Sequence, residues 1–142
     1  MNVSTRFTVA LHVLTLLALS AGKALTSEYI AGSVNTNPVV VRRLLGTLRK
    51  LGIVSSQPGN GGGWELAVAP GKLSLRDIRQ ALNEGSPFSM HSQTPNPKCP
   101  VGKNIQRILS PIYDEAEQAM EARLARTTIL SLLRSVQETQ RK

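Results

Sequence analysis

One helix with a clear beginning and a clear end constrains the fold of this chain most. Asn37 and Pro38 predict its start, because an asparagine side chain caps a helix well and a proline at the first helical position loses no hydrogen bond. Gly52 predicts its end, since glycine readily adopts the left-handed conformation that follows many helices. Apolar residues recur between these points at helical spacing and predict the face that packs against a core: Val41, Leu44, Leu45, Leu48 and Leu51.

A β-hairpin is predicted directly after this helix. Residues 53–57 and 64–68 are short strand-like runs, and the segment 58–63 between them contains Asn-Gly, a strong signal for a hairpin turn. The glycine-rich tip exposes backbone N–H groups that can approach a phosphate closely. It lacks the Gly-Lys-Ser/Thr sequence of a nucleotide-binding P-loop, which excludes that class of site.

Helices are also predicted before and after this unit. Residues 7–19 are apolar at helical spacing and favour a core helix that contains His12 as a core histidine, although a short secretory signal has a similar length. The other expected boundaries are an N-cap at Thr26 or Ser27, a break at Gly32-Ser33, an N-cap at Ser74 and a helix stop at Gly85.

The second half of the chain is expected to be a loop followed by helices. Residues 86–102 show no periodic pattern and predict a functional loop or a linker. A long apolar stripe then predicts a long helix, in which Pro111 marks a kink or a restart capped by Ser110. Thr127 or Thr128 is expected to cap a last helix. The stripe consists of Ile105, Ile108, Leu109, Ile112, Ala116, Met120 and Leu124.

The expected fold class is mainly α with a small β-hairpin wing. Two helices, a turn, a third helix and a hairpin follow the order of a winged helix-turn-helix domain, which we expect over residues 1–85. Residues 86–103 are expected to form an effector or sensor loop, and residues 104–142 a helical dimerisation region. The apolar stripe has two explanations, which are burial against a second copy of the chain and packing back onto its own domain.

The charge distribution favours a polyanionic partner. The net charge is +8, and residues 1–83 carry nine of the 17 Lys and Arg but only three of the nine Asp and Glu. A helix fits the major groove of B-DNA, where Arg42 and Arg43 can reach a guanine edge and a phosphate. The residues expected to contact double-stranded DNA are Thr26, Ser27, Asn37, Val39, Arg42, Arg43, Thr47, Lys50, Gln57, Asn60 and Gly61.

Five motifs are spread along the chain, and the resemblance that they carry covers essentially its whole length. They are Ser-Thr-Arg-Phe at 4–7, Leu-Arg-Lys-Leu-Gly-Ile-Val-Ser-Ser at 48–56, Gly-Gly-Gly-Trp-Glu-Leu at 61–66, Leu-Ser-Leu-Arg-Asp-Ile at 73–78 and Asn-Pro-Lys-Cys-Pro-Val-Gly-Lys at 96–103. Together they resemble the Rrf-two family of bacterial winged helix-turn-helix transcription regulators, and the last motif is similar to its YwnA-like branch. The resemblance implies a cytoplasmic homodimer, joined through the long helix, that represses transcription by placing one helix of each subunit in the major groove of a palindromic operator.

The chain departs from that family at two places. Iron–sulfur members carry three cysteines in the loop before the long helix, whereas this chain has only Cys99, so no cofactor and no metal site is expected. A cluster would need other ligands, such as His91 or a thiolate of a second subunit. Many members have Arg at the start of the wing, where this chain has Gln57, which leaves open whether the wing contacts DNA.

Cys99 is expected to be either a sensor thiol or a small buried residue. Lys98 and the start of the following helix both favour the thiolate, which responds to oxidants and electrophiles. The expected partners are therefore double-stranded DNA, a second copy of the chain and a small-molecule or redox effector, with no membrane. Two competing functions are a winged-helix module that binds proteins and a thiol enzyme that uses Cys99 with His91, although no orienting group for such an enzyme is evident.

Overall fold

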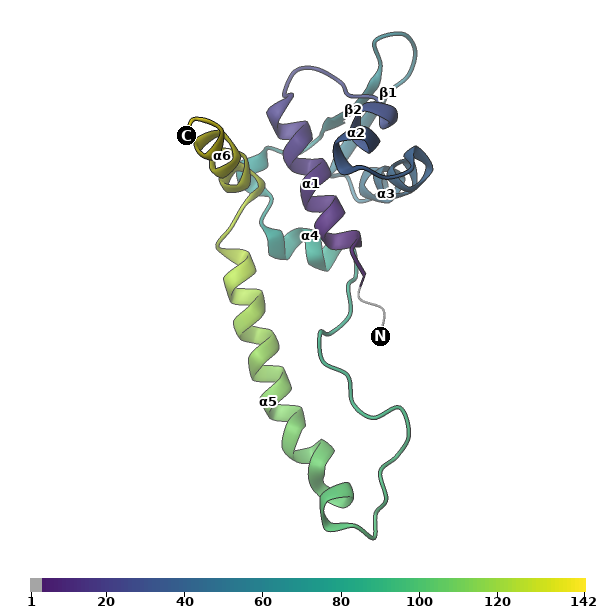
Figure 1. The fold of residues 1–142 in the computed structure, drawn as a ribbon, viewed down its shortest axis with the longest axis vertical. Helices are drawn as coiled ribbons and strands as arrows, with labels where there is room; N and C mark the ends of the chain where they lie inside the picture. Colours follow the sequence, from purple (N-terminus) through teal and green to yellow (C-terminus); the bar gives the residue numbers. More distant parts are fainter. Residues whose placement is uncertain (1–3) are drawn as a thin grey trace.

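The chain folds into a mainly helical winged helix-turn-helix domain with a two-stranded hairpin, as expected (Figure 1). The structure is a computed structural model that describes residues 4–142. Its elements follow one another as α1 (Arg6–Leu19), α2 (Ser27–Val34), α3 (Pro38–Lys50), β1 (Val54–Gln57), β2 (Gly63–Leu66), the short 3-10 helix η1 (Pro70–Lys72), α4 (Leu75–Ala81), α5 (Pro100–Ala125) and α6 (Ile129–Gln140).

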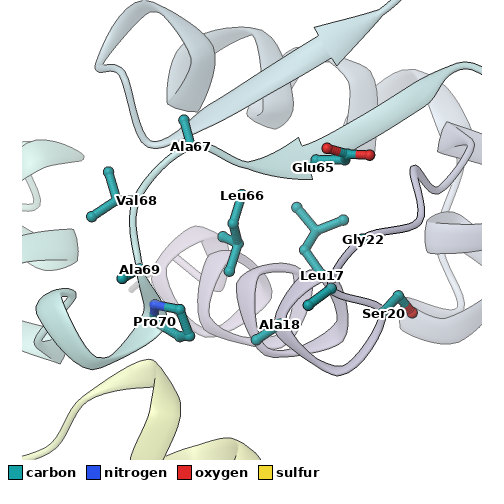
Figure 2. Close-up of a pocket in the computed structure, with 11 residues that line it drawn as sticks. Leu17, Ala18, Ser20, Gly22, Glu65, Leu66, Ala67, Val68, Ala69 and Pro70 are labelled. Carbon is teal, nitrogen blue, oxygen red and sulfur yellow. The ribbon is translucent and has the colours of Figure 1, made fainter.

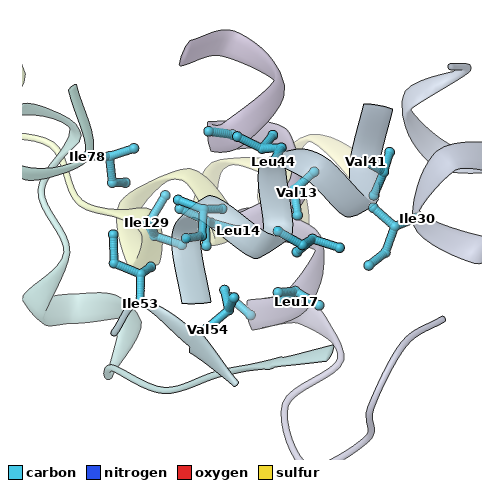
Figure 3. Close-up of a cluster of buried hydrophobic side chains, with 14 of the residues drawn as sticks. Val13, Leu14, Leu17, Ile30, Val41, Leu44, Ile53, Val54, Ile78 and Ile129 are labelled. Atoms are coloured by element: carbon cyan, nitrogen blue, oxygen red, sulfur yellow. The ribbon is translucent and has the colours of Figure 1, made fainter. Parts of the chain in front are cut away.

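The hydrophobic core forms around α1. Helices α2, α4 and α6 and strand β2 contact α1, and α3 joins the same core through its buried face. Figure 3 shows Val13 and Leu14 of α1 among side chains from α3 and α6. The expected core helix over residues 7–19 is therefore confirmed. The expectation for His12 is wrong, because its ring lies on the exposed side of α1, with Nε2 2.8 Å from Oγ of Ser33 on α2.

Two expected helix ends and one expected core residue are wrong. Helix α2 continues through Gly32 and ends at Asn35, whose φ is 65°. Helix α4 ends before Asn83, whose φ is 54°, and not at Gly85. Asparagine adopts this left-handed conformation because its short polar side chain bonds locally. Leu51 is 44% exposed, since it follows the last residue of α3 and its side chain falls beyond the buried stripe.

The predicted start and end of α3 are confirmed. The side-chain oxygen of Asn37 accepts a hydrogen bond of 2.8 Å from the backbone N–H of Val39, and Pro38 is the first helical residue. Gly52 has a φ of 77° and ends the helix. The chain therefore enters and leaves α3 through signals that are local in the sequence.

The predicted hairpin is fixed to the body of the domain at Gly63. Strands β1 and β2 pair antiparallel, with Val54 opposite Leu66. Leu25 and Trp64 exchange two backbone hydrogen bonds of 2.8 and 3.0 Å. A Cβ at Gly63 would lie 2.4 Å from the carbonyl oxygen of Leu25, and φ there is 146°. Only glycine permits this close approach, so it sets the direction of the hairpin.

Helix α5 extends away from the domain (Figure 1). It begins at Pro100, inside the expected loop, and continues through Pro111, so the expected restart at Ser110 is wrong. No residue of α5 is buried, and only its last turn reaches the core, through Leu124. Most of the apolar stripe is therefore not packed against its own domain. Neither α5 nor any other helix among residues 4–142 is long and apolar enough to cross a membrane.

Helix α6 turns back onto the domain. Thr128 caps it as expected, with its side chain accepting a hydrogen bond from the backbone N–H of Ser131. Ile129 is fully buried in the core, and Leu132 and Leu133 pack against that core. The region expected over residues 104–142 thus consists of an extended helix and a helix that completes the winged helix-turn-helix body.

Replacing Ile129 by Ala should lower the free energy of unfolding by about 2–5 kcal/mol, because it leaves a cavity in the core. Chemical denaturation followed by circular dichroism measures the change. Gln137→Ala on the exposed side of the same helix is the matched control and should change it by less than about 0.5 kcal/mol. Equal stability of the two variants would contradict the packing of α6 described above.

Candidate nucleic-acid interface

The exposed face of α3 is the most concentrated cationic surface on a regular element of the described chain. Burial of Val41, Leu44, Leu45 and Leu48 turns the opposite face outward. That face carries exposed Val39, Arg43 and Lys50, and Arg42 and Arg49 lie along one edge of it. Thr47 is half-buried, and its hydroxyl donates to the carbonyl oxygen of Arg43. The outward orientation predicted for Val39, Arg42, Arg43 and Lys50 is thus present, whereas Thr47 lies at the border of the buried face.

Arg42 is held against α2. Its Nη2 lies 2.8 Å from Oε1 of Glu28, and this hydrogen bond holds the pKa of the Glu28 carboxyl below its usual value. Both side chains are about half exposed, so the ion pair contributes little to stability. It orients Arg42 instead. Arg43 has no side-chain hydrogen bond or ion pair with any other residue of the described chain, so its guanidinium is free to meet a ligand.

Trp64 ties the hairpin to α2 and α3. Its indole N–H donates a hydrogen bond of 3.1 Å to Oγ of Ser27, and the guanidinium of Arg49 lies 5.7 Å from its ring centroid. Arg49 also donates to the hydroxyl of Ser56 on β1. The sequence did not single out Arg49 or Trp64 for the interface. Their signal was present, because Arg49 lies two helical turns after Arg42 and so on the same edge of α3.

Several residues expected to contact DNA have structural roles instead or in addition. Ser27 is buried, with its hydroxyl occupied by Trp64, so it is not part of the exposed surface. Thr26 and Asn37 are exposed, but their side-chain oxygens cap α2 and α3. The three hairpin residues expected to contact DNA are all exposed: Gln57, Asn60 and Gly61. Nε2 of Gln57 lies 3.5 Å from Oε2 of Glu65.

Gly46 is a third residue that sequence reasoning missed. It lies inside α3, where glycine costs a helix roughly 0.5–1 kcal/mol relative to alanine. A Cβ at this position would meet no atom within 4 Å, so packing within the chain does not require glycine. The residues three and four positions away on either side are all cationic: Arg42, Arg43, Arg49 and Lys50.

Cys99 lies at the start of α5 and is exposed, so the expectation of a small buried residue is wrong. The backbone N–H groups of Gly102 and Val101 lower the pKa of its thiol, because they stabilise the thiolate. The expected charge effect of Lys98 is not among the causes. His91 pairs with Gln106 through Nδ1, at 3.3 Å from Nε2, and not with the thiol.

A resident iron–sulfur cluster does not fit these donors. Cys99 is the only cysteine in the sequence, and no group of three His, Cys, Asp or Glu side chains converges within residues 4–142. Protein-held clusters need several thiolate or imidazole ligands around the irons. The chain's own side chains therefore do not supply a cluster site.

Near its C-terminal end, α5 is joined to α4 by a cluster of charged side chains. Glu121 pairs with Arg79, and its second oxygen lies 3.7 Å from Nε of Arg76. Arg79 also donates to the carbonyl oxygen of Gly85. The side chains of Arg79 and Glu121 are 11% and 18% exposed, so this contact is the most buried ion pair described in the chain. It fixes the position of α5 relative to the winged helix-turn-helix body.

A cavity of about 270 Å³ lies between the end of α1 and residues 65–70 (Figure 2). Its lining includes Leu17, Ala18 and Leu66, and Glu65 is the only titratable side chain there. A single half-buried carboxylate without a nucleophile or a second acid–base group does not form a catalytic site. The cavity therefore adds no alternative to the cationic face of α3.

Known proteins with similar sequences and folds include three informative cases. The chain is 37% identical over 131 residues, 92% of its length, to YwnA of Bacillus subtilis, which is named as an HTH-type transcriptional regulator and is covered over 96% of its own length. Its fold matches T. potens IscR with a TM-score of 0.76 at 24% identity, covering 99% of this chain and 91% of that one. It matches B. subtilis CymR, titled the global cysteine regulator, with a TM-score of 0.67 at 24% identity, covering 95% and 98%.

The family itself follows from a match that spans nearly the whole chain. The sequence profile of the Rrf2 family, described as "Iron-dependent Transcriptional regulator", matches residues 3–135. The winged helix-turn-helix fold and the cationic face of α3 agree with this match. The chain belongs to the Rrf2 family of transcriptional regulators, a class of DNA-binding proteins and not of enzymes.

Proposed function

We propose that the chain is a homodimeric repressor that places α3 of each subunit in successive major grooves of a near-palindromic DNA site. The observation that carries this proposal is the outward face of α3, where Arg43 and Lys50 are exposed without an acidic partner. Cationic side chains about two turns apart on one face of a rigid helix can contact base edges and phosphates together. Glu28 of α2, which contacts the edge of this face, is already paired with Arg42.

A second copy of the chain is the best partner for α5. This helix has 26 residues and is about 39 Å long. Ile108 and Ile112 are each 54% exposed on it, and Ile105, Leu109 and Met120 are only half-buried. Two such helices that pack against each other would bury the stripe and pair two copies of α3 by a two-fold axis. That symmetry is the reason to expect a palindromic site.

In this proposal, DNA binding would be regulated by a small molecule or by modification of a thiol in the loop before α5. Cys99 is exposed, and its thiolate is stabilised by the first backbone N–H groups of α5. Oxidation or alkylation at this point would alter the start of the helix that we assign to dimerisation. The loop lies along α5, since Phe88 stacks on Tyr113 with ring centroids 4.8 Å apart.

Selection of bound fragments from genomic DNA by the purified protein, with and without reductant, tests this function directly. We expect enrichment of a near-palindrome, with affinity that falls on the order of a thousandfold between about 50 and 200 mM salt if six or more phosphates are contacted. Equal affinity for the enriched duplex and for a scrambled duplex at physiological salt would overturn specific binding. Absence of any salt-dependent retention would favour the winged-helix protein-interaction module.

Arg43→Ala and Arg42→Ala should have different effects on DNA binding. Arg43 is free and faces outward, so its loss should reduce operator affinity about tenfold or more and relax the preference at one base pair. Arg42 lies at the edge of α3, so its loss should weaken operator and scrambled duplex alike and lower the salt slope by about one. Fluorescence anisotropy over a salt series measures both. Identical profiles for the two variants would contradict this division.

Replacing Ile108 and Ile112 together by Asp should convert the dimer to a monomer, because charges would lie in an apolar interface. Sedimentation velocity measures the mass of the variant. Its affinity for the operator should fall when the dimer is lost. Arg107→Ala changes a neighbouring exposed residue outside the stripe and should leave the dimer intact. A dimer that survives both isoleucine substitutions would show that α5 is not the interface.

The rate of alkylation of Cys99 by iodoacetamide should reach half its maximum at a pH below the ordinary value for cysteine, about 8.5. The direction follows from the lowered pKa of a thiolate that accepts backbone hydrogen bonds. Mass spectrometry across a pH series measures the rate, and the unfolded protein in denaturant provides the reference. A midpoint equal to that of the unfolded chain would remove the argument for a reactive thiol.

A further inference from the structure

Glycine inside α3 has no explanation within the fold. The backbone at Gly46 is helical, and a Cβ there would meet no atom within 4 Å. Glycine weakens a helix because it loses the most conformational freedom on folding. By contrast, Gly63 is required by its φ and by the nearby Leu25 carbonyl. The presence of glycine at position 46 is therefore explained by a contact with another molecule and not by the fold of this chain.

The position of Gly46 on α3 indicates what kind of molecule makes this contact. Positions three and four residues apart are neighbours on a helix surface, so Gly46 is surrounded by Arg42, Arg43, Arg49 and Lys50. Arg42 is directed to Glu28 of α2, and Arg49 to Trp64 of the hairpin. Both therefore stay on one side of Gly46. Arg43 and Lys50 lie on its other side, and neither is drawn toward an acidic residue.

By the periodicity of α3, its cationic side chains lie in two rows on either side of a strip of helix surface that consists of Gly46 and Val39, which are two helical turns apart. We call this strip the floor between the rows. Helix α3 itself contains no acidic residue, so the two rows favour an anion that lies between them. The floor carries no side-chain hydrogen-bond donor, and 52% of Val39 is exposed. A floor of this kind suits the apolar and flat parts of base edges better than a phosphate.

We propose that Gly46 is the point at which α3 comes closest to the DNA, and that its missing side chain is required for operator binding and not for folding. This proposal rests on the proposed function and deepens it. The backbone of α3 lies against base edges at Gly46, while the flanking Arg and Lys side chains reach past it on both sides. Val39, on the same floor, contacts the methyl group of a thymine, which is the apolar group of the major groove.

Gly46→Ala separates this role from a structural one, because the two give effects of opposite sign. The variant should melt a few degrees higher than the wild type, since alanine favours the helix and no atom is displaced. It should bind the duplex recovered with the wild type about tenfold or more weakly, an effect comparable to one wrong base pair. Gly46→Val should bind more weakly still, because its side chain is larger.

Gly32→Ala is the matched control. Gly32 is also helical, with nothing within 4 Å of its Cβ position, but its neighbours on α2 include no Lys or Arg. This variant should gain stability and keep wild-type affinity for the operator. An equal loss of affinity in Gly32→Ala would overturn the proposal, because it would show that binding responds to helix stiffness in general.

The non-specific complex gives a second readout. A scrambled duplex of the same composition is held mainly through phosphates, so Gly46→Ala should bind it as the wild type does. Gly46→Ala with wild-type affinity for the operator would overturn the close approach and leave the proposed function intact. Failure of the wild type to distinguish the two duplexes would instead overturn the proposed function itself.

Discussion

Burial of one face of α3 in the core around α1 is the constraint on which the rest of the interface depends. Leu45 and Leu48 of α3 are fully buried in the same cluster as Val13 and Leu14 of α1. A helix that buries one stripe must expose the opposite one, so this packing alone turns Arg43 outward. The cationic groups are consequently carried by a helix held by core contacts, which is a firmer support than a loop.

Trp64 extends this rigidity to the neighbouring elements. The sequence has one Trp, and it lies where α2, α3 and the hairpin meet. Its backbone pairs with Leu25, its N–H is satisfied by Ser27, and Arg49 lies over its ring. A large indole ring that packs on one side and donates its N–H to a hydrogen bond holds the neighbouring side chains in place. Helices α2 and α3 and the hairpin therefore keep one relative arrangement.

Local chemistry explains which features could be predicted from the sequence. The start of α3 depends only on Asn37 and Pro38, and the capping of α6 on Thr128, so both were predictable. The end of α2 was not, because Gly32 and Asn35 are both acceptable end signals and only packing decides between them.

Long-range contacts account for the remaining failures. The burial of Ser27 depends on Trp64, which is 37 residues away. The return of α6 to the core depends on a cavity that Ile129 fills among residues from distant parts of the chain. Gly46 was visible as a glycine in a helical pattern, but only the structure shows that no atom of the chain needs its space.

The junction between α4 and α5 decides how a dimer would present its two copies of α3. Glu121 contacts Arg79 and Arg76, and Leu124 packs against the core one turn later, so α5 leaves the body in a defined direction. Such a partly buried ion pair contributes more to a defined geometry than to stability, because desolvation offsets much of its attraction. In the loop before α5, Ser86 donates a hydrogen bond to Glu117 on α5. Under the proposed function, a chemical change at Cys99 would therefore reach the DNA-facing helices through the position or pairing of α5.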